Sequence, residues 1–224
     1  WFPQNPLPKL PAIFGLDPSG VVEAVGAQVY DFKVGDRVYV NPGRYCGSCR
    51  ACRAGNTIAC TAYTFNGYFG FTPKSPRMLE DYPYGGLCEY IPAPQYSLVK
   101  LPDNISFETA ARLGYMGTAY KALLKANVGP GSTVLINGIS GTLGLGAVVL
   151  ALALGARKIL GTARNQDLFQ KVKDLAAPGR IEIHTLGTIP TNEWAHEVTH
   201  GEGVDAVIDA LGPGAPHESL TQAL

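Results

Sequence analysis

A glycine-rich turn between two apolar runs constrains the fold of this chain more than any other feature. The apolar run 134–136 leads into the turn 138–144, which is followed by the apolar stretch 145–154, and a second apolar run ends just before Arg164. Strand, glycine turn, helix and strand is the order of a dinucleotide-binding unit. Missing side chains let the backbone approach a pyrophosphate, and the helix N-terminus presents free N–H groups to it.

The spacing of this turn leaves two interpretations open. Its glycines follow G-x-x-G-x-x-G rather than the stricter G-x-G-x-x-G, so the glycines alone fit a structural turn as well as a phosphate cradle. The flanking strands and helix favour the nucleotide site. The turn residues expected to contact the nucleotide are Gly138, Ser140, Gly141, Thr142, Leu143 and Gly144.

The C-terminal half alternates strand and helix patterns, which predicts a parallel sheet with right-handed crossovers. The expected strands cover 133–137, 158–163, 181–186 and 204–210, and the expected helices cover 142–154, 166–176 and 192–199. A doubly wound sheet of this kind has about six strands. We therefore expect a nucleotide-binding domain over residues 119–224 that is truncated at its C-terminus.

Short β-type runs separated by Gly and Pro turns fill the first part of the chain. They lie at 20–26, 37–40, 89–91 and 97–101. Their spacing favours a β-barrel-like domain. Residues 61–84 are expected to form one long loop, whose aromatic side chains could line a pocket or pack against one another. Helical patterns follow at 106–114 and 118–126.

A cluster of cysteines marks a metal site. Its members, spaced C-x2-C-x2-C-x7-C, are Cys46, Cys49, Cys52 and Cys60. Thiolates so close in sequence can fold a loop around one tetrahedral Zn²⁺ with no open position, as in a structural site. Arg44, Arg50 and Arg53 stand nearby and offset the negative charge. Disulfides, unligated thiols and an iron–sulfur cluster are the alternatives, while the isolated Cys88 is expected to serve packing.

The charge balance gives no electrostatic reason to expect a nucleic-acid or membrane partner. Lys+Arg and Asp+Glu both number 18, so the formal net charge is zero. The apolar run 143–156 is shorter than the roughly 20 residues of a membrane span. No signal-peptide pattern opens the chain, so a soluble, cytoplasmic location is expected. The chain opens without Met, and we expect it to be a fragment of a longer protein.

Several segments, in order, resemble the zinc-type alcohol dehydrogenases of the medium-chain dehydrogenase/reductase superfamily. They are GLDPSGVVEAVG with VGDRV, the four-cysteine segment, GGLCEYIPAP with LVKLPD, LGYMGTAYKAL and VLINGISGTLGLGA. The resemblance implies an α/β chain with a GroES-like β-barrel catalytic domain over residues 1–118, including a zinc lobe at 46–60. A Rossmann domain with a doubly wound parallel sheet would follow over residues 119–224, with both domains incomplete in this chain.

The same resemblance implies a class of chemistry. Members transfer hydride between a nicotinamide nucleotide and a small molecule, here an alcohol, ketone, aldehyde or enone. They are commonly homodimers or homotetramers. By position, Thr118 resembles the family threonine that packs beside the nicotinamide, and Ala210 stands where the ring would pass.

Two positions depart from the family pattern. Leu16 stands where members with catalytic zinc carry the His of Gly-His-Glu, and Gly114 stands where they carry a Cys, with residues 118–123 held in register. Neither side chain can ligate a metal. The resemblance therefore predicts a structural zinc at the cysteine cluster and no catalytic zinc.

Without a metal, the charge that develops on a carbonyl oxygen needs a hydrogen-bond or proton donor. Tyr115, next to Gly114, is the candidate donor, and Asp17 is its candidate partner. A packed tyrosine and a turn carboxylate are the alternatives for these two residues.

The end of the second strand of the nucleotide domain bears on the choice of cofactor. An acidic residue there binds the ribose diol of NAD, but this chain has Ala163, followed by Arg164 and Asn165. An arginine at this place can bind a 2′-phosphate with two parallel hydrogen bonds, although a solvated arginine would look the same in sequence. NADP is the expected cofactor, with NAD as the alternative.

These features lead to one main hypothesis about function. It is an NADP(H)-dependent, alcohol dehydrogenase-like oxidoreductase that works without catalytic zinc. The alternatives are a quinone- or enone-type reductase of the same superfamily and a non-catalytic nucleotide-binding homologue.

Overall fold

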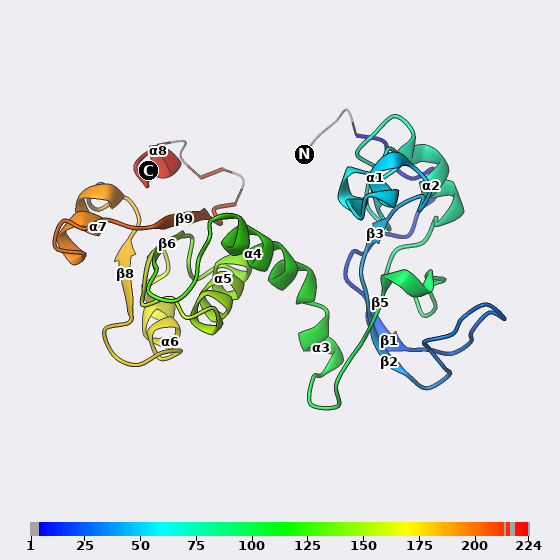
Figure 1. The fold of residues 1–224 in the computed structure, drawn as a ribbon, viewed down its shortest axis with the longest axis horizontal. Helices are drawn as coiled ribbons and strands as arrows, with labels where there is room; N and C mark the ends of the chain where they lie inside the picture. Colours follow the sequence, from blue (N-terminus) through cyan, green and yellow to red (C-terminus); the bar gives the residue numbers. More distant parts are fainter. Residues whose placement is uncertain (1–4, 213, 216–217, 224) are drawn as a thin grey trace. The chain divides into compact units, whose positions relative to one another are not determined.

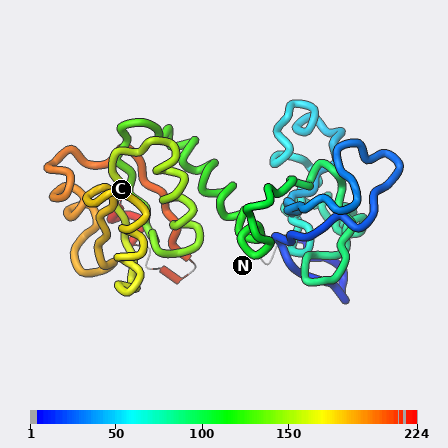
Figure 2. Tube along the Cα trace, turned by 90° about the horizontal axis from the view of Figure 1, so that it is seen from below, coloured from blue at the N-terminus to red at the C-terminus, as the bar shows by residue number. Residues whose placement is uncertain are grey.

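The chain forms two compact units, Trp1–Gly114 and Tyr115–Leu224. The structure is a computed structural model that describes residues 5–212, 214–215 and 218–223. Figure 1 labels the elements of each unit, and Figure 2 traces the path of the chain through them. The boundary expected after residue 118 falls inside helix α4 (Leu113–Lys125).

The first unit is built on a three-stranded antiparallel sheet. Its strands are β1 (Ser19–Val21), β2 (Arg37–Val40) and β5 (Leu98–Lys100), in the order β1-β2-β5. Tyr39 on the central strand pairs with Ser19 on one side and with Val99 on the other. Because β2 has neighbours on both edges, its residues Val38, Tyr39 and Val40 are buried.

Two strands expected in this unit differ from the observed ones. The run 20–26 contributes only the short strand β1. At Val22 the regular ladder ends, since its N–H donates to Asp36 O and its carbonyl accepts from Gly35 N, both at 2.9 Å. Residues 89–91 do not form a strand. Their alternating apolar pattern would need a neighbouring strand, and no strand in the described part of the chain pairs with them.

The expectation of one long loop over residues 61–84 is wrong. The segment contains β4 (Thr64–Phe65), which pairs with β3 (Gly43–Arg44), and helix α2 (Ser75–Asp81). Ser75 Oγ organises the start of this helix: it accepts from the N–H groups of Phe71 (3.2 Å) and Thr72 (3.1 Å). The helix was missed because it is short and its anchors are tertiary contacts.

Helix α3 (Phe107–Ala110) opens where the sequence predicts it, with Ser106 Oγ accepting from Thr109 N at 3.2 Å. The hydroxyl and the free N–H form an N-cap. Helix α4 then begins at Leu113 rather than at Thr118. Tyr115 and Thr118 consequently lie on one helix.

The second unit contains a four-stranded parallel sheet in the order β8-β7-β6-β9. Its strands match the predicted ones within a few residues. They are β6 (Thr133–Asn137), β7 (Lys158–Ala163), β8 (Ile181–Thr185) and β9 (Ala206–Asp209). The helices are α5 (Thr142–Ala153), α6 (Phe169–Lys173) after the 3-10 turn η3 (Gln166–Leu168), α7 (Thr191–Val198) and α8 (Glu218–Thr221).

Apolar clusters cover both faces of this sheet. One joins Ile136 and Ile159 to α4, α5 and α6 through residues such as Val148, and the other joins Leu135 and Leu160 to α7. Side chains that alternate along a strand point to opposite faces, so helices on both sides are required to bury them, as in a doubly wound sheet. In the described part of the chain no helix is long and apolar enough to cross a membrane.

Candidate functional site

The glycine turn lies at the carboxyl end of β6 and opens helix α5. Gly141 is the N-cap of that helix, and Gly138 adopts a φ of +81°, which favours glycine. A β-carbon on Gly144 would lie 2.9 Å from the carbonyl carbon of Ile139. The first N–H groups of a helix have no intrahelical acceptor. Strand, turn and helix therefore form the close backbone approach that a pyrophosphate site needs.

The neighbouring strand β7 holds this turn in place. The N–H groups of Gly138 and Ile139 both donate to Thr162 O, at 3.0 and 2.9 Å. The side chain of Ile139 fills the space above Gly161, where a β-carbon would be 2.6 Å from the Ile139 β-carbon. Gly161 is thus required on β7 because the turn packs onto it.

A buried polar network connects three strand ends beside the turn, and sequence analysis missed it. Asn137 is fully buried; its Nδ2 donates to Asp209 Oδ1 (3.3 Å) and to the carbonyl of Ser219 (3.0 Å). Thr162 Oγ1 donates to Asn137 Oδ1. The available signal was that a polar residue ends or nearly ends each apolar strand pattern. This network ties β6, β7 and β9 together at the edge where open parallel sheets bind ligands.

Three other predicted nucleotide contacts, Arg164, Asn165 and Ala210, directly follow strands β7 and β9 at the same edge of the sheet. Ala163 is the buried last residue of β7, and Arg164 directly after it is exposed. Asn165 Oδ1 accepts from Asp167 N at 3.0 Å and so caps the turn η3. Ala210 N donates to Asn137 O at 2.9 Å. Thr118 is an exposed residue of α4.

The four clustered cysteines come together as predicted. Their sulfur atoms all lie within 4.8 Å of one another. Helix α1 (Arg50–Arg53) and the turn η1 (Thr57–Ala59) shape the loop between them. Tetrahedral Zn–S bonds of about 2.3 Å place sulfur atoms just under 4 Å apart, so the cluster fits one Zn²⁺. All five cysteines of the chain are free thiols, so no disulfide competes.

The thiols of the cluster differ in their pKa values. Backbone N–H groups near Ser48 lower the pKa of Cys46, and those of Cys52 and Thr61 lower the pKa of Cys49 to about 6. Burial and the neighbouring thiols raise the pKa of Cys52 to about 12. Sulfur atoms this close cannot all carry charge unless a cation joins them. A bound Zn²⁺ removes that conflict.

Asp17, the candidate catalytic carboxylate, lies against Gly114. Gly114 stands where the family pattern has a cysteine ligand. Oδ1 of Asp17 accepts a 2.6 Å hydrogen bond from the hydroxyl of Tyr39. A β-carbon on Gly114 would collide with the same Oδ1. Burial, followed by the Asp17 carboxylate, raises the pKa of Tyr39 far above its usual range, so this phenol remains a donor. Tyr39, on a central strand, was not predicted as a site residue.

The other two residues singled out at the departures from the family pattern, Leu16 and Tyr115, have different surroundings. Leu16 is half-buried, and no metal ligand replaces the expected histidine at its position. Tyr115 begins the second unit on helix α4 and keeps 44% of its surface exposed. Its side chain is therefore not part of the buried core.

The aromatic side chains of residues 63–71 pack against one another. The ring centroids of Phe65 and Phe71 lie 4.9 Å apart in an edge-to-face arrangement, and those of Phe69 and Phe71 lie 4.9 Å apart. Such pairs stabilise a fold beyond their buried area. Of the two readings left open by the sequence, packing describes these rings.

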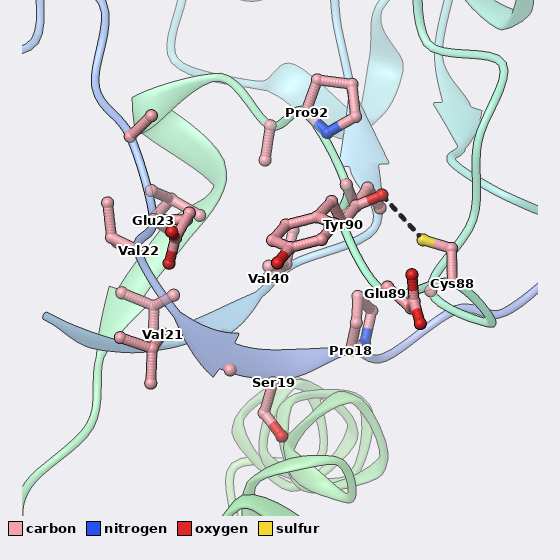
Figure 3. A pocket seen from close by; sticks show the side chains of 17 residues that line it. Pro18, Ser19, Val21, Val22, Glu23, Val40, Cys88, Glu89, Tyr90 and Pro92 are labelled. Carbon is pink, nitrogen blue, oxygen red and sulfur yellow. Dashed lines mark hydrogen bonds between the residues drawn. The ribbon is translucent and has the colours of Figure 1, made fainter. Parts of the chain in front are cut away.

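A separate cavity of about 540 Å³ lies between β1, β2 and the segment 86–93 (Figure 3). Its walls are mainly apolar, with Val21, Val40 and the ring of Tyr90. Cys88 Sγ donates to the carbonyls of Gly85 and Tyr90 at 3.0 Å. Cys88 therefore fixes the wall of this cavity, which agrees with the packing role expected for it.

Comparison with known proteins identifies the first unit. Residues 2–103 match the family described as "Alcohol dehydrogenase GroES-like domain". A domain of this kind with a four-thiol lobe, followed by a parallel nucleotide-type sheet, defines a two-domain dehydrogenase/reductase.

Relatives extend the similarity over almost the whole chain. "Probable D-xylulose reductase A" of Aspergillus clavatus is 34% identical over 206 residues, which are 91% of this chain and 54% of that protein. "L-idonate 5-dehydrogenase" of Vitis vinifera is 33% identical over 209 residues, 93% of this chain and 54% of that protein. A crystal structure of an NAD-dependent alcohol dehydrogenase shares 31% identity with a TM-score of 0.81, covering 96% of this chain and 58% of that one.

The chain belongs to the medium-chain dehydrogenase/reductase superfamily, among its zinc-type alcohol dehydrogenase-like members. The family and the α/β fold class predicted from the sequence are confirmed. The chain spans about half the length of the curated relatives it matches.

Proposed function

We propose that the protein is an NADP(H)-dependent oxidoreductase that interconverts an alcohol and a carbonyl compound. The observation that carries this proposal is the glycine turn 138–144, held at the carboxyl end of β6 and opening helix α5. The nicotinamide nucleotide would supply or accept the hydride. The relatives named as a D-xylulose reductase and an L-idonate dehydrogenase support an alcohol/carbonyl pair as the substrate.

The preference for NADP rests on the end of β7. Ala163 offers no carboxylate to a ribose diol, and the exposed Arg164 offers a planar cation to a 2′-phosphate. The backbone N–H groups at the start of α5 would bind the pyrophosphate. Thr118 and Ala210 are the residues proposed to lie beside the nicotinamide.

The proposed reaction proceeds without catalytic zinc. Leu16 has no ligand atom, and at position 114 the Asp17 carboxylate fills the space that a ligand side chain would need. Charge on the substrate oxygen would then be stabilised by a hydrogen-bond donor. We assign this role to the Tyr115 phenol, with Asp17, oriented by Tyr39, as the acid–base partner.

The same departures favour a second candidate function. Superfamily members lacking catalytic zinc are typically quinone or enone reductases, and the absence of a ligand atom at Leu16 and Gly114 supports such an activity. The Cys46–Cys60 cluster, in contrast, keeps the structural zinc site. A non-catalytic nucleotide-binding protein is the third candidate.

One set of assays separates these candidates. The full-length, zinc-loaded protein is mixed with NADPH or NADH and with a panel of aldehydes, ketones, quinones and enones. Turnover of aldehydes or ketones supports the proposal, and turnover of quinones or enones alone supports the second candidate. Tight NADPH binding without turnover on any substrate would support the non-catalytic one. Metal analysis is expected to give one zinc per chain, and two would contradict the zinc-free site.

A further inference from the structure

The first unit buries a positive charge that the proposed function does not use. Arg44 lies on β3, opposite Thr64 of β4, and its relative exposure is 0%. Arginine remains charged at any pH a protein experiences. A buried charge is retained only where other groups compensate it. The surroundings of this guanidinium therefore show what must bind it.

One half of the guanidinium is satisfied by the backbone. Nη1 donates to the carbonyl of Asn41 at 2.6 Å and to the carbonyl of Gly43 at 3.3 Å. Nε and Nη2 are buried and have no hydrogen-bond partner among the described residues. These two nitrogens form one edge of the planar group, the edge that binds a carboxylate through two parallel hydrogen bonds.

Aromatic side chains surround this guanidinium. Cζ of Arg44 lies 5.4 Å from the centre of the Tyr82 ring. The phenols of Tyr63 and Tyr96 are also close, and burial raises the pKa of both, so they remain uncharged. The ring faces attract the cation, but they provide no acceptor in the guanidinium plane.

None of the described residues supplies an acid to this position. The ion pairs in its described part use the carboxylates of Asp36, Glu182 and Glu202, each with another cation. The residues outside the description, 1–4, 213, 216–217 and 224, include no Asp or Glu. A water molecule could accept a hydrogen bond but carries no charge, and although Arg44 stands near the cysteine cluster in sequence, no described sulfur atom accepts from these two nitrogens.

We propose that Arg44 is an anion-binding residue whose Nε–Nη2 edge holds a carboxylate group. The backbone bonds at Nη1 fix the plane of the guanidinium, and the Tyr82 ring lies near it. The edge is thus oriented before the ligand arrives, which reduces the entropy lost on binding. The carboxylate belongs either to a small free acid or to an Asp or Glu side chain from a part of the protein beyond these residues.

Arginine-selective ¹⁵N NMR of the full-length, zinc-loaded protein tests the proposal. Sodium formate and sodium acetate are the probes, with sodium chloride at equal ionic strength as the reference. We expect the Nε–H signal of Arg44 to shift saturably with either carboxylate and the melting temperature to rise with it, whereas chloride gives no saturable change.

Two variants show whether the response to carboxylates comes from Arg44. Arg44→Lys keeps the charge but lacks the planar edge, and it should weaken acetate binding by on the order of tenfold or more. Arg37→Lys is the matched control. Arg37 bonds to the carbonyls of Pro102 and Ile105 at 3.0 and 2.6 Å, so its replacement should leave the acetate response unchanged.

A crystal structure of the full-length protein identifies the source of the carboxylate. If the signal does not respond and an Asp or Glu of the same protein lies within about 3 Å of Nε and Nη2, the proposal holds and the ligand is a side chain. If the signal does not respond and only water or ring carbons face these nitrogens, the proposal is overturned. Arg44 then has a structural role, as a cation packed against the Tyr82 ring.

Discussion

The hydroxyl of Tyr39 donates a 2.6 Å hydrogen bond to Oδ1 of Asp17, and the same oxygen occupies the place of a β-carbon on Gly114. Three residues from a central strand, a loop and the start of a helix thus meet at one carboxylate. Their contact accounts for the absence of a side chain at position 114, which in the sequence is only a departure from a family pattern.

A side chain at position 114 should therefore be costly. Gly114→Ala should lower the free energy of unfolding by about 1–3 kcal/mol, because the methyl group displaces a held carboxylate. The measurement is urea denaturation. Gly117→Ala on the same helix is the matched control: its β-carbon would meet nothing within 4 Å, so it should stabilise by about 0.5–1 kcal/mol.

A double mutant shows whether the carboxylate is the cause. In the background of Asp17→Ala, the penalty of Gly114→Ala should disappear, giving a coupling energy above the error of such cycles. An undiminished penalty would mean that some other contact excludes a side chain at 114.

Removal of the Tyr39 hydroxyl should produce a pH-dependent loss of stability. Tyr39→Phe breaks a buried bond to a carboxylate and should cost about 1.5–3 kcal/mol near neutral pH. The folded state raises the pKa of Tyr39 above the ordinary tyrosine value of about 10, so the folded protein holds this proton more tightly than the unfolded chain. The stabilisation is thus complete below pH 10 and is lost as the pH rises beyond it.

The check is the difference in unfolding free energy between the wild type and Tyr39→Phe, measured from pH 8 to pH 11. The difference should shrink above pH 10. A difference that stays constant across that range would argue against the Tyr39–Asp17 bond, since Tyr63 and Tyr96 titrate equally in both proteins.

The zinc cluster should depend on each of its thiols. Cys46→Ser should reduce the zinc content to well below one per chain and lower the melting temperature, because a closed structural site contributes directly to folding. Elemental analysis and thermal unfolding measure the two effects. Cys88→Ser, whose thiol bonds to carbonyls elsewhere in the unit, should keep its zinc. Equal zinc contents in both variants would disprove ligation by Cys46.

Arg164 should discriminate between the two nicotinamide nucleotides. Arg164→Ala should raise the KM for NADPH by about tenfold or more, because a charge-assisted bidentate contact is lost, and should change the KM for NADH little. Steady-state kinetics with each nucleotide gives the comparison. Arg157, just before β7 and paired with Glu202 at 3.2 Å, is the control; its alanine variant should affect both nucleotides equally. If Arg164→Ala does the same, the NADP preference has lost its basis.

Elements with a strong local pattern were predictable, and those that depend on tertiary contacts were not. The run 133–137 has five buried residues and forms β6 as expected. Helix α2 and the pair β3–β4 were missed because their stability comes from Ser75 and from the partner strand rather than from local periodicity.

The site residues likewise divide into those with a local sequence pattern and those that depend on tertiary contacts. The four cysteines are close in sequence, so their spacing alone predicts the cluster that the structure contains. The glycines of the turn follow a strand pattern and precede a helix, and this local order was sufficient to find them. Tyr39 and Arg44 carry no such local signal, and the polar end of the β6 pattern at Asn137 is only a weak one. The importance of these residues lies in partners far along the chain or in the lack of one.

The sequence by itself determined the family, the alternation of strands and helices in the second unit, the thiolate cluster and the place of the glycine turn. Each depends on residues within about one turn or strand of each other, so a linear pattern contains the information. Only the tertiary structure decided why position 114 is glycine, what holds Asp17 and which nitrogens of Arg44 face no partner. Those facts depend on close packing between segments distant in sequence, where the space for a single carbon atom decides which side chain can be present.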